Sequence, residues 1–396
     1  MKCKVNVGDL REALQLVLIT VDRRQGSELG YIYIGAKNTK PGGQRIVLYS
    51  TDSVTRMISR VNCEVEEPGE LIVEPTRLAS VIERQPDAAD VTFIKDATKK
   101  DRVTARCGNV RCVLSSQVTT KEVFEVQMGL FPYKAPNLFQ IEADNLKALL
   151  DRTAAFIFKK DGRENFKNVH IRSVQGGYEA LSTNTEVVAR ASITDANSTF
   201  QAGAPAVVLD IPGRALAGLT KMLNRSKKET IRVILTATPA GTPNAIYFRT
   251  GDVFFGTSLP AEGLPPIDAI FTNQRMDSSI EVARAPFLDS VSRSNPFCLE
   301  CDTGRMVRVE LNGASLKLMA SDSSGEFEEE IAASGAVAGK RSGVFRSSYL
   351  SDVLRNSAEE NVTFKLGVAF PHNMTTALMT LGADNGASYV VSGARN

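Results

Sequence analysis

The sequence predicts an α+β protein built from three repeated domains. Three helical patterns with one apolar face begin the thirds of the chain, at Val7–Val17, Ala143–Thr153 and Arg284–Arg293. Three more helical patterns close the thirds, at Pro75–Arg84, Pro212–Arg225 and Arg346–Arg355, and their leucines Leu78, Leu216 and Leu350 can be aligned. The nearly constant spacing between the aligned leucines is the size of a domain and is too long for a solenoid repeat.

The strand patterns repeat at the same distance as the helices. Each third contains an apolar run that ends in a short polar turn, at 47–52, 178–184 and 316–322. Aligning Thr51, Thr183 and Asp322 gives spacings close to those of the leucines, so two kinds of element agree on one period. We interpret the Ser, Thr, Asp and Asn residues of these runs as turn formers that bond to nearby backbone, and we assign them no chemistry.

Composition and length agree with three globular domains. The 396 residues are 43% apolar and 23% charged, which is typical of a soluble protein that forms cores. We expect domains at 1–125, 137–264 and 279–396, with linkers at 118–137 and 263–279 where prolines interrupt the strand patterns. Because no segment approaches the roughly 20 apolar residues of a membrane span, and residues 1–5 lack the apolar core of a signal peptide, we expect a cytoplasmic protein.

The sequence contains no recognisable catalytic motif. Of the two histidines, His170 lies in a strand-like segment, where a structural role is expected, and His372 follows a proline. Six scattered cysteines are too sparse for a disulfide scaffold, and Cys298 with Cys301 has the spacing of only half a zinc site. We therefore expect no enzyme, no cofactor and no metal, although carboxylates paired only in space would escape this search.

Basic side chains gather on the helix faces that point away from the predicted core. In the helix at 212–225, Arg214, Lys221 and Arg225 fall on the side opposite Leu216, Leu219 and Leu223. Similar cations are Arg77 and Arg84 in the first third, and Lys159, Lys160, Arg163 and Lys167 in the second. Each basic face alone could simply be the solvated side of an amphipathic helix, but their recurrence on equivalent helices favours a surface for a polyanion.

The modest charge limits the kind of nucleic-acid contact. The net charge is only +2 and there is no Trp, so base-stacking platforms are not indicated. If DNA is the partner, the contact should be weak, directed at phosphates and independent of sequence.

Several stretches, in order along the whole chain, resemble the bacterial DNA polymerase III beta subunit, the sliding clamp. The stretches that carry the resemblance are 69–75 (GELIVEP), 163–169 (RENFKNV), 181–185 (LSTNT), 348–354 (SYLSDVL) and 387–391 (ASYVV). The resemblance implies a head-to-tail homodimer that closes a six-domain ring, with helices lining a hole and antiparallel sheets outside. It also implies duplex DNA, a DNA polymerase and a clamp loader as partners, and a role as a processivity factor in DNA replication.

The resemblance also implies which residues bind. By position, Arg24 and Lys160 correspond to DNA-contacting residues of the family, and charge placement adds Arg23, Lys159, Arg163, Lys221 and Arg225. Family clamps carry a groove between the second and third domains that accepts a short Gln/Leu/Phe-type peptide. Its wall here would be Phe166, Thr183, Thr185, Glu186, Val187, Val188, Pro265, Ile270, Val390, Val391, Ser392 and Ala394, each of which could equally be a strand-core residue.

The chain departs from the family at the groove and at the subunit edge. Thr185-Glu186-Val187-Val188 stands where the family has a Gly-His-Arg-Leu run, so we expect a changed peptide motif. At the dimer interface, Cys112, Ser292 and Arg293 occupy positions where the family buries apolar side chains. We expect a divergent clamp with its own polymerase, of the kind encoded by a phage or a mobile element. The main alternative is a three-domain scaffold or binding protein that forms no ring and has no DNA role.

Overall fold

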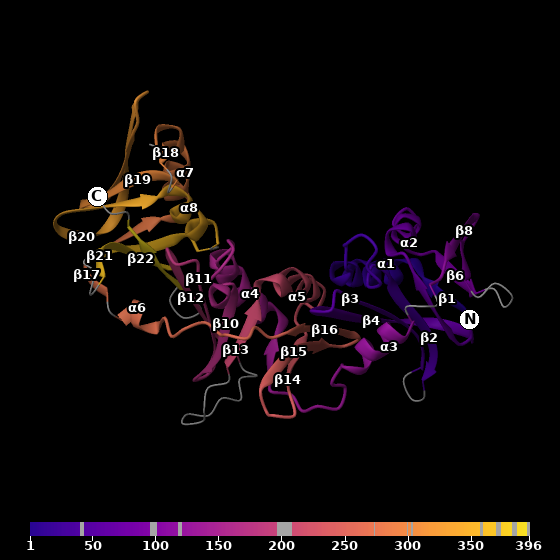
Figure 1. Ribbon diagram of the computed structural model, residues 1–396. Coiled ribbons are helices and arrows are strands. Elements are labelled where there is room, and N and C mark those ends of the chain that lie inside the picture. Colours follow the sequence, from indigo (N-terminus) through magenta and orange to yellow (C-terminus); the bar gives the residue numbers. More distant parts are fainter. Residues whose placement is uncertain are drawn as a thin grey trace. The chain divides into compact units, whose positions relative to one another are not determined.

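The computed structural model describes residues 1–39, 43–95, 101–117, 121–195, 208–272, 274–298, 300–301, 304–356, 359–369, 374–381 and 386–393. The chain forms two compact units, one of residues 1–144 with 214–259 and the other of residues 145–213 with 260–396. Each unit contains one large antiparallel sheet and the helices that pack on it (Figure 1). Residues 137–264, the expected central domain, are shared between the two units, and the three-domain division stays a prediction.

The first unit contains a twelve-stranded sheet. Its main path runs β8-β7-β6-β1-β4-β16-β15-β14-β9, and β3, β2 and β5 continue from β4. The strands are β1 (Lys2–Asn6), β2 (Ile32–Thr39), β3 (Gly43–Thr51), β4 (Thr55–Glu67), β5 (Gly69–Val73), β6 (Asp90–Lys95), β7 (Arg102–Cys107), β8 (Val110–Ser115), β9 (Phe139–Glu142), β14 (Thr230–Ala237), β15 (Pro243–Thr250) and β16 (Val253–Ser258). The thirteen-residue β4 joins the parts of this sheet because it pairs with β1, β3 and β16.

Three helices of this unit follow the predicted pattern. They are α1 (Val7–Val17), α2 (Pro75–Ile82) and α5 (Gly213–Arg225), the last of which belongs to this unit from its second residue on. The Asn6 side chain caps α1 by accepting a bond from the Asp9 N–H, and the Glu74 carboxylate caps α2, whose first residue is a proline. The apolar faces of α1 and α2 are fully buried at Leu10 and Leu78.

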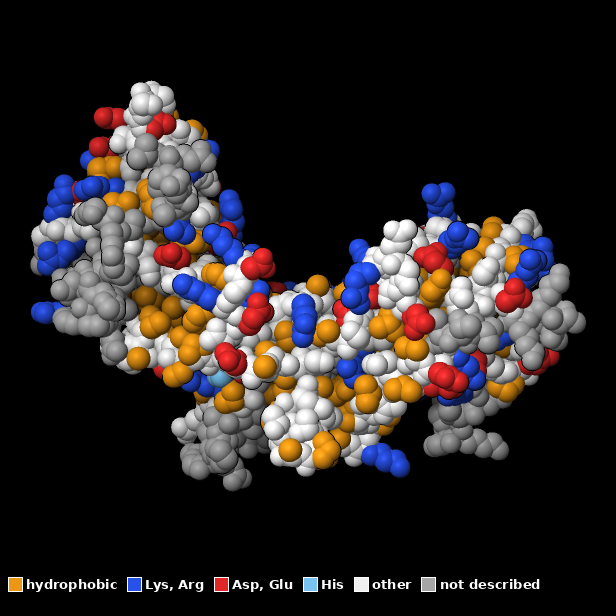
Figure 2. Space-filling model, in the orientation of Figure 1, with side chains coloured by type: hydrophobic (Ala, Val, Ile, Leu, Met, Phe, Trp, Pro, Cys, Tyr) orange, Lys and Arg blue, Asp and Glu red, His pale blue; other side chains and the backbone are white. Residues whose placement is uncertain are grey.

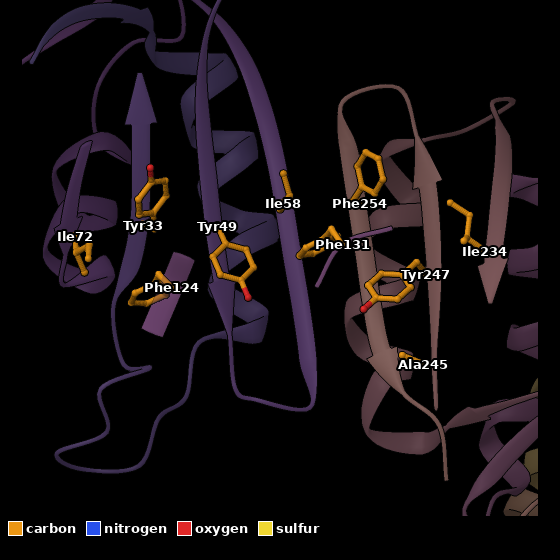
Figure 3. Packing of buried hydrophobic residues seen from close by; sticks show 10 residues of the cluster. All are labelled: Tyr33, Tyr49, Ile58, Ile72, Phe124, Phe131, Ile234, Ala245, Tyr247 and Phe254. Atoms are coloured by element: carbon orange, nitrogen blue, oxygen red, sulfur yellow. The ribbon is translucent and has the colours of Figure 1, made fainter. Parts of the chain in front are cut away.

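A fourth helix, α3 (Lys121–Gly129), occupies the segment expected to be a linker. It lies on the opposite side of β3 and β4 from α1 (Figure 1). Its Phe124 meets Tyr49 edge to face at 5.9 Å between ring centres, and Phe131 just after it lies between Tyr49 and Tyr247 (Figure 3). Phe124 and Phe131 are at most 4% exposed, so this segment forms part of a hydrophobic core, which corrects the expectation of a simple connection.

The second unit contains an eleven-stranded sheet in the order β13-β10-β11-β12-β23-β22-β21-β17-β20-β19-β18. The strands are β10 (Asn168–Val174), β11 (Gly177–Thr183), β12 (Val187–Thr194), β13 (Val208–Pro212), β17 (Gln274–Ala283), β18 (Glu300–Cys301), β19 (Gly304–Ser321), β20 (Glu326–Arg346), β21 (Asn361–Ala369), β22 (Met374–Leu381) and β23 (Ala387–Ser392). The helices are α4 (Ala143–Thr153), α6 (Asp268–Thr272), α7 (Arg284–Ser294) and α8 (Ser347–Arg355). The short α6 lies in the second expected linker.

The six helices expected from the repeat are confirmed, and their ends lie close to the predicted ends. None of the helices in the described ranges has the length and apolar character that a membrane crossing requires.

The polar turns after the repeated strands are confirmed as turn-forming devices. After β3, the Asp52 carboxylate accepts bonds from two backbone N–H groups, those of residues 54 and 55. After β11, the Asn184 side chain accepts the equivalent bonds from residues 186 and 187, at 3.0 and 2.8 Å. After β19, the Asp322 carboxylate accepts from residues 324 and 325. The same side-chain device therefore closes the corresponding turn in each third of the chain.

Candidate functional site

The helix α5 presents a basic face on the first unit. Its buried face consists of Ala215, Gly218, Leu219, Met222 and Leu223, and Leu216 lies half-buried at the border. Lys221 is exposed and forms no ion pair with the described part of the chain. Arg225 is also exposed, but its guanidinium lies 3.3 Å from the Glu12 carboxylate of α1. Lys221 is therefore free to bind an external anion, whereas Arg225 must first leave its ion pair with Glu12.

The loop after α1 carries Arg23 and Arg24 beside a buried carboxylate. Arg24 donates to Asp22 through Nε at 3.0 Å and through a terminal nitrogen at 2.6 Å, and Ser27 donates to the same carboxylate. These bonds hold the pKa of Asp22 well below its usual range. The Arg24 side chain is nevertheless 78% exposed, so the pair holds the guanidinium in place at the surface. Arg23 is exposed as well.

The second unit carries Lys159, Lys160 and Arg163 in the loop after α4. All three are exposed, and Arg163 has left-handed backbone (φ 52°) with its guanidinium 5.6 Å from the ring centre of Phe158. Lys159 and Lys160 border a hollow of about 310 Å³. On the face seen in Figure 2, basic side chains stand on the helical side of each unit with acidic side chains among them. The predicted DNA-binding residues thus form local groups within each unit.

An apolar cluster on the second unit's sheet contains four of the twelve predicted groove residues. Its buried members are Leu181, Val188, Leu264, Ile267 and Val390, and its partly buried members are Phe166, Ile270, Phe271 and Leu378. Val188 of β12 stands opposite Val390 of β23, which stands opposite Leu378 of β22. Residues opposite one another in an antiparallel sheet share a face, so these side chains line one continuous patch.

Other predicted groove residues lie elsewhere. Val187 and Val391 oppose each other on the other face of the sheet and are completely buried, so they are core residues. Thr183 is 3% exposed, and its hydroxyl donates to a backbone carbonyl of the turn.

Most of the remaining predicted groove residues are polar. Thr185 is exposed, Pro265 is half-buried, and the Ser392 N–H donates to the Glu186 carbonyl at 2.8 Å. The Glu186 carboxylate lies 3.6 Å from the Arg346 guanidinium. Ala394 lies outside the described residues.

The helix α6, which sequence reasoning missed, supplies one wall of the cluster. Ile267, Ile270 and Phe271 pack against the sheet from this segment. Arg172 of β10 donates to both oxygens of Asp268, at 2.9 and 2.5 Å, and also donates to Glu179. The hydrogen bonds from Arg172 lower the pKa of Asp268. The i, i+3, i+4 spacing of the three apolar residues is the signal for this helix in the sequence.

This ion-pair network is completed by a second arginine. Arg190 lies 3.6 Å from the Glu179 carboxylate, and its guanidinium covers the Phe271 ring at 4.3 Å from the ring centre. The sheet therefore holds α6 through two arginines that share one buried carboxylate.

The residues considered for catalysis or metal binding have structural partners. His170 bonds through Nδ1 to Asp210 at 3.0 Å, as expected for a structural histidine. Glu328 and Glu329 pair with Lys317 and Arg293 on the surface of β20. In the ranges described above, no group of three or more His, Cys, Asp or Glu side chains is placed to hold a metal ion. His372 lies outside those ranges.

The predicted interface residues lie near the exposed surface of each unit. Cys112 is half-buried on β8, which is the end strand of the first sheet. The neighbouring Val110 and Val113 are 40% and 46% exposed. In the second unit, Ser292 donates to the Leu288 carbonyl, and Arg293 is paired with Glu329 of its own chain.

Comparisons with known proteins place the whole chain beside one family. No family model matches the sequence. The beta sliding clamp of Pseudomonas aeruginosa is 24% identical over 384 residues, which is 96% of each chain, and that of Pseudomonas putida is 24% identical over 385 residues, again 96% of each chain.

Solved structures show the same fold. A DNA polymerase sliding clamp from P. aeruginosa covers all of both chains with a TM-score of 0.83 at 20% identity. A DNA polymerase III beta clamp of the same species, solved bound to griselimycin, gives a TM-score of 0.83 at 22% identity over all of both chains. The sliding clamp from Bacillus subtilis gives 0.82 at 18% identity and covers 100% of this chain and 99% of its own. The chain is thus similar to beta sliding clamps over nearly its whole length and has the same fold as the solved sliding clamps.

Proposed function

We propose that this protein is a DNA sliding clamp, a processivity factor that encircles duplex DNA without reading its sequence. The observation that carries the proposal is the match to beta sliding clamps over 96% of both chains. The proposal assigns the protein no catalytic role. The proposed partners are duplex DNA, a DNA polymerase, a clamp loader and a second copy of the protein.

The basic helix faces fit weak phosphate binding. Exposed Lys221 and Lys160 have no ion-pair partner among the described residues, and such cations can exchange freely between phosphates. A ring would hold the duplex by enclosing it, so the individual contacts can be few and weak without loss of the DNA. The modest net charge of +2 is consistent with a ring that holds DNA by enclosing it and makes only weak phosphate contacts.

The charge-reversal variant Lys160→Glu/Lys221→Glu tests the DNA surface. We expect its binding to a labelled duplex to fall about tenfold or more, and the salt dependence to become shallower by roughly one unit of slope per lost phosphate contact. The matched control is Lys134→Glu/Arg308→Glu, which makes the same change in charge at two other exposed positions. Equal loss in both variants, or no loss in either, would favour the scaffold without a DNA role.

We further propose that the apolar patch around Val188, Val390 and Ile270 binds the peptide of the polymerase and other partners. Partly exposed Phe166, Ile270 and Leu378 can bury apolar anchors of an incoming peptide, while the neighbouring buried residues fix the shape of the site. Glu186, two residues before Val188 and paired with Arg346, offers a carboxylate to polar groups of the peptide. This chemistry agrees with a motif altered from that of other clamps.

A further inference from the structure

Three arginines lie together on the first unit's sheet, on the face that carries the aromatic cluster. Arg232 of β14 stands opposite Arg249 of β15, and Arg249 stands opposite Phe254 of β16. Phe254 in turn stands opposite Ile58 of β4, and Arg60 is two residues farther along that strand. Opposed residues and residues two apart share a face, so the three guanidinium groups project from the same side of the sheet.

The acidic side chains near these arginines are bonded to other groups. Within the described ranges, none of the three forms an ion pair, although Asp252 is close enough to act on Arg249. Asp252 is paired with Arg45, and the carboxylate of Glu229 is bonded to the Thr250 hydroxyl. Like charges directly opposite each other destabilise a sheet. Burial, together with the charges of Arg232 and Arg60, lowers the pKa of Arg249.

Aromatic rings hold two of the guanidinium groups in place. Arg249 lies 4.6 Å and Arg60 lies 5.2 Å from the ring centre of Phe254, and Arg60 lies 5.5 Å from that of Tyr133. A guanidinium stacked on a ring keeps its N–H donors in its own plane, where they can bind a carboxylate through two parallel bonds. Arg60 and Arg249 are therefore ordered before any ligand arrives.

A hollow and exposed apolar side chains accompany the charges. The hollow measures about 520 Å³ and is bordered by Arg232 and Arg249. Tyr133 is 43% exposed and Leu130 is 49% exposed. Both belong to the segment that follows α3, and the Leu130 carbonyl accepts a bond from Tyr247, two residues from Arg249 on β15. Apolar and cationic groups are thus side by side on one surface.

We propose that this arginine cluster, Arg60, Arg232 and Arg249, is a docking site for an acidic peptide segment of a partner protein that also carries apolar residues. Aspartate or glutamate carboxylates would bind the guanidinium groups, and apolar residues would cover Leu130 and Tyr133. A peptide fits better than a nucleic-acid strand, because a sugar-phosphate backbone has no aliphatic side chains to cover the exposed Leu130. The site is separate from the proposed DNA and peptide surfaces.

The test is the binding of a labelled peptide of about twelve residues, made of Glu-Glu-Ile-Tyr repeats, measured by fluorescence anisotropy. Arg232→Ser/Arg249→Ser should weaken binding about tenfold or more, because two charge-assisted pairs are lost. Lys160→Ser/Lys221→Ser removes the same charge elsewhere and should leave peptide binding unchanged while weakening duplex binding. Phe166→Ala, in the proposed groove for the polymerase peptide, should also leave it unchanged.

Three outcomes would overturn the proposal. They are no binding of the peptide, equal binding by the Arg232→Ser/Arg249→Ser variant, and tighter binding of a labelled oligothymidine that the same variant abolishes. Any of these outcomes would leave the proposed clamp function untouched, because that function is tested by duplex binding of the variants at Lys160 and Lys221.

Discussion

Single side chains of the proposed peptide site differ in what they can do, because neighbouring strand residues face opposite ways. Val188 and Val390 face the apolar patch, whereas Val187 and Val391 face the core and are completely buried. A carboxylate at Val391 would therefore test stability and not the site, since an unpaired charge in a core is costly. The partly exposed Phe166 and Ile270 are better probes.

We predict that Phe166→Ala weakens binding of a labelled peptide with Leu and Phe anchors about tenfold, since truncation of an aromatic anchor typically costs more than about 1 kcal/mol. The unfolding midpoint should change little, because Phe166 is only partly buried. Fluorescence anisotropy and thermal unfolding of the same sample measure the two effects. Unchanged affinity would remove Phe166 from the site. If stability falls strongly as well, Ile270→Ser is the deciding variant.

At the scale of elements, α6 is held to the sheet by charge as well as by apolar packing. The two bonds from Arg172 to Asp268 fix the start of this five-residue helix, which is too short to be stable alone. Since α6 carries Ile270 and Phe271, loosening it should disturb the apolar patch. The ion pair thus links a surface charge to the shape of the proposed peptide site.

We predict that Asp268→Asn lowers the free energy of unfolding by about 1 kcal/mol or less at neutral pH, as expected for a partly exposed pair. The folded-state pKa of Asp268 lies below the ordinary value of 3.8, so its contribution is present above that pH and is lost as the pH falls through the lower value. Urea unfolding of the wild-type protein and of Asp268→Asn, at neutral pH and at about pH 3, measures the difference in the free energy of unfolding. A difference that persists unchanged in acid would contradict the assignment to this carboxylate.

The sequence predicts elements better than contacts. Helix ends follow from capping residues and apolar periodicity, and the turns at Asp52, Asn184 and Asp322 follow from local side-chain chemistry. The pattern around Phe131 predicts only a linker, because its burial depends on Tyr49 and Tyr247, which are far away in the sequence. The pairing of Arg172 with Asp268 and the arginine cluster also join distant segments. Periodicity within a segment contains no information about such contacts.

At the scale of the whole molecule, the proposed ring requires contacts between two copies. The end strand β8 exposes Val110 and Val113, and an unpaired strand edge with apolar side chains is suited to pairing with another chain. Head-to-tail contacts of this kind use different surfaces and close after two copies when the geometry allows it. The predicted interface residue Cys112 lies on the same strand.

We predict that Val113→Lys shifts the protein from dimer to monomer, because a charge at a strand edge opposes pairing with another strand. The matched control is Val208→Lys, since Val208 is equally exposed, at 46%, on β13 at the end of the other sheet. Light scattering after size exclusion at micromolar concentration measures both. A dimer that survives Val113→Lys but not Val208→Lys would place the interface elsewhere.

The central claim is that two copies of this chain close a ring around DNA, and direct imaging tests it best. Electron microscopy of the purified protein in negative stain, at micromolar concentration, should show closed rings with a central hole and six lobes. Compact particles without a hole would contradict the account and favour the scaffold without a DNA role.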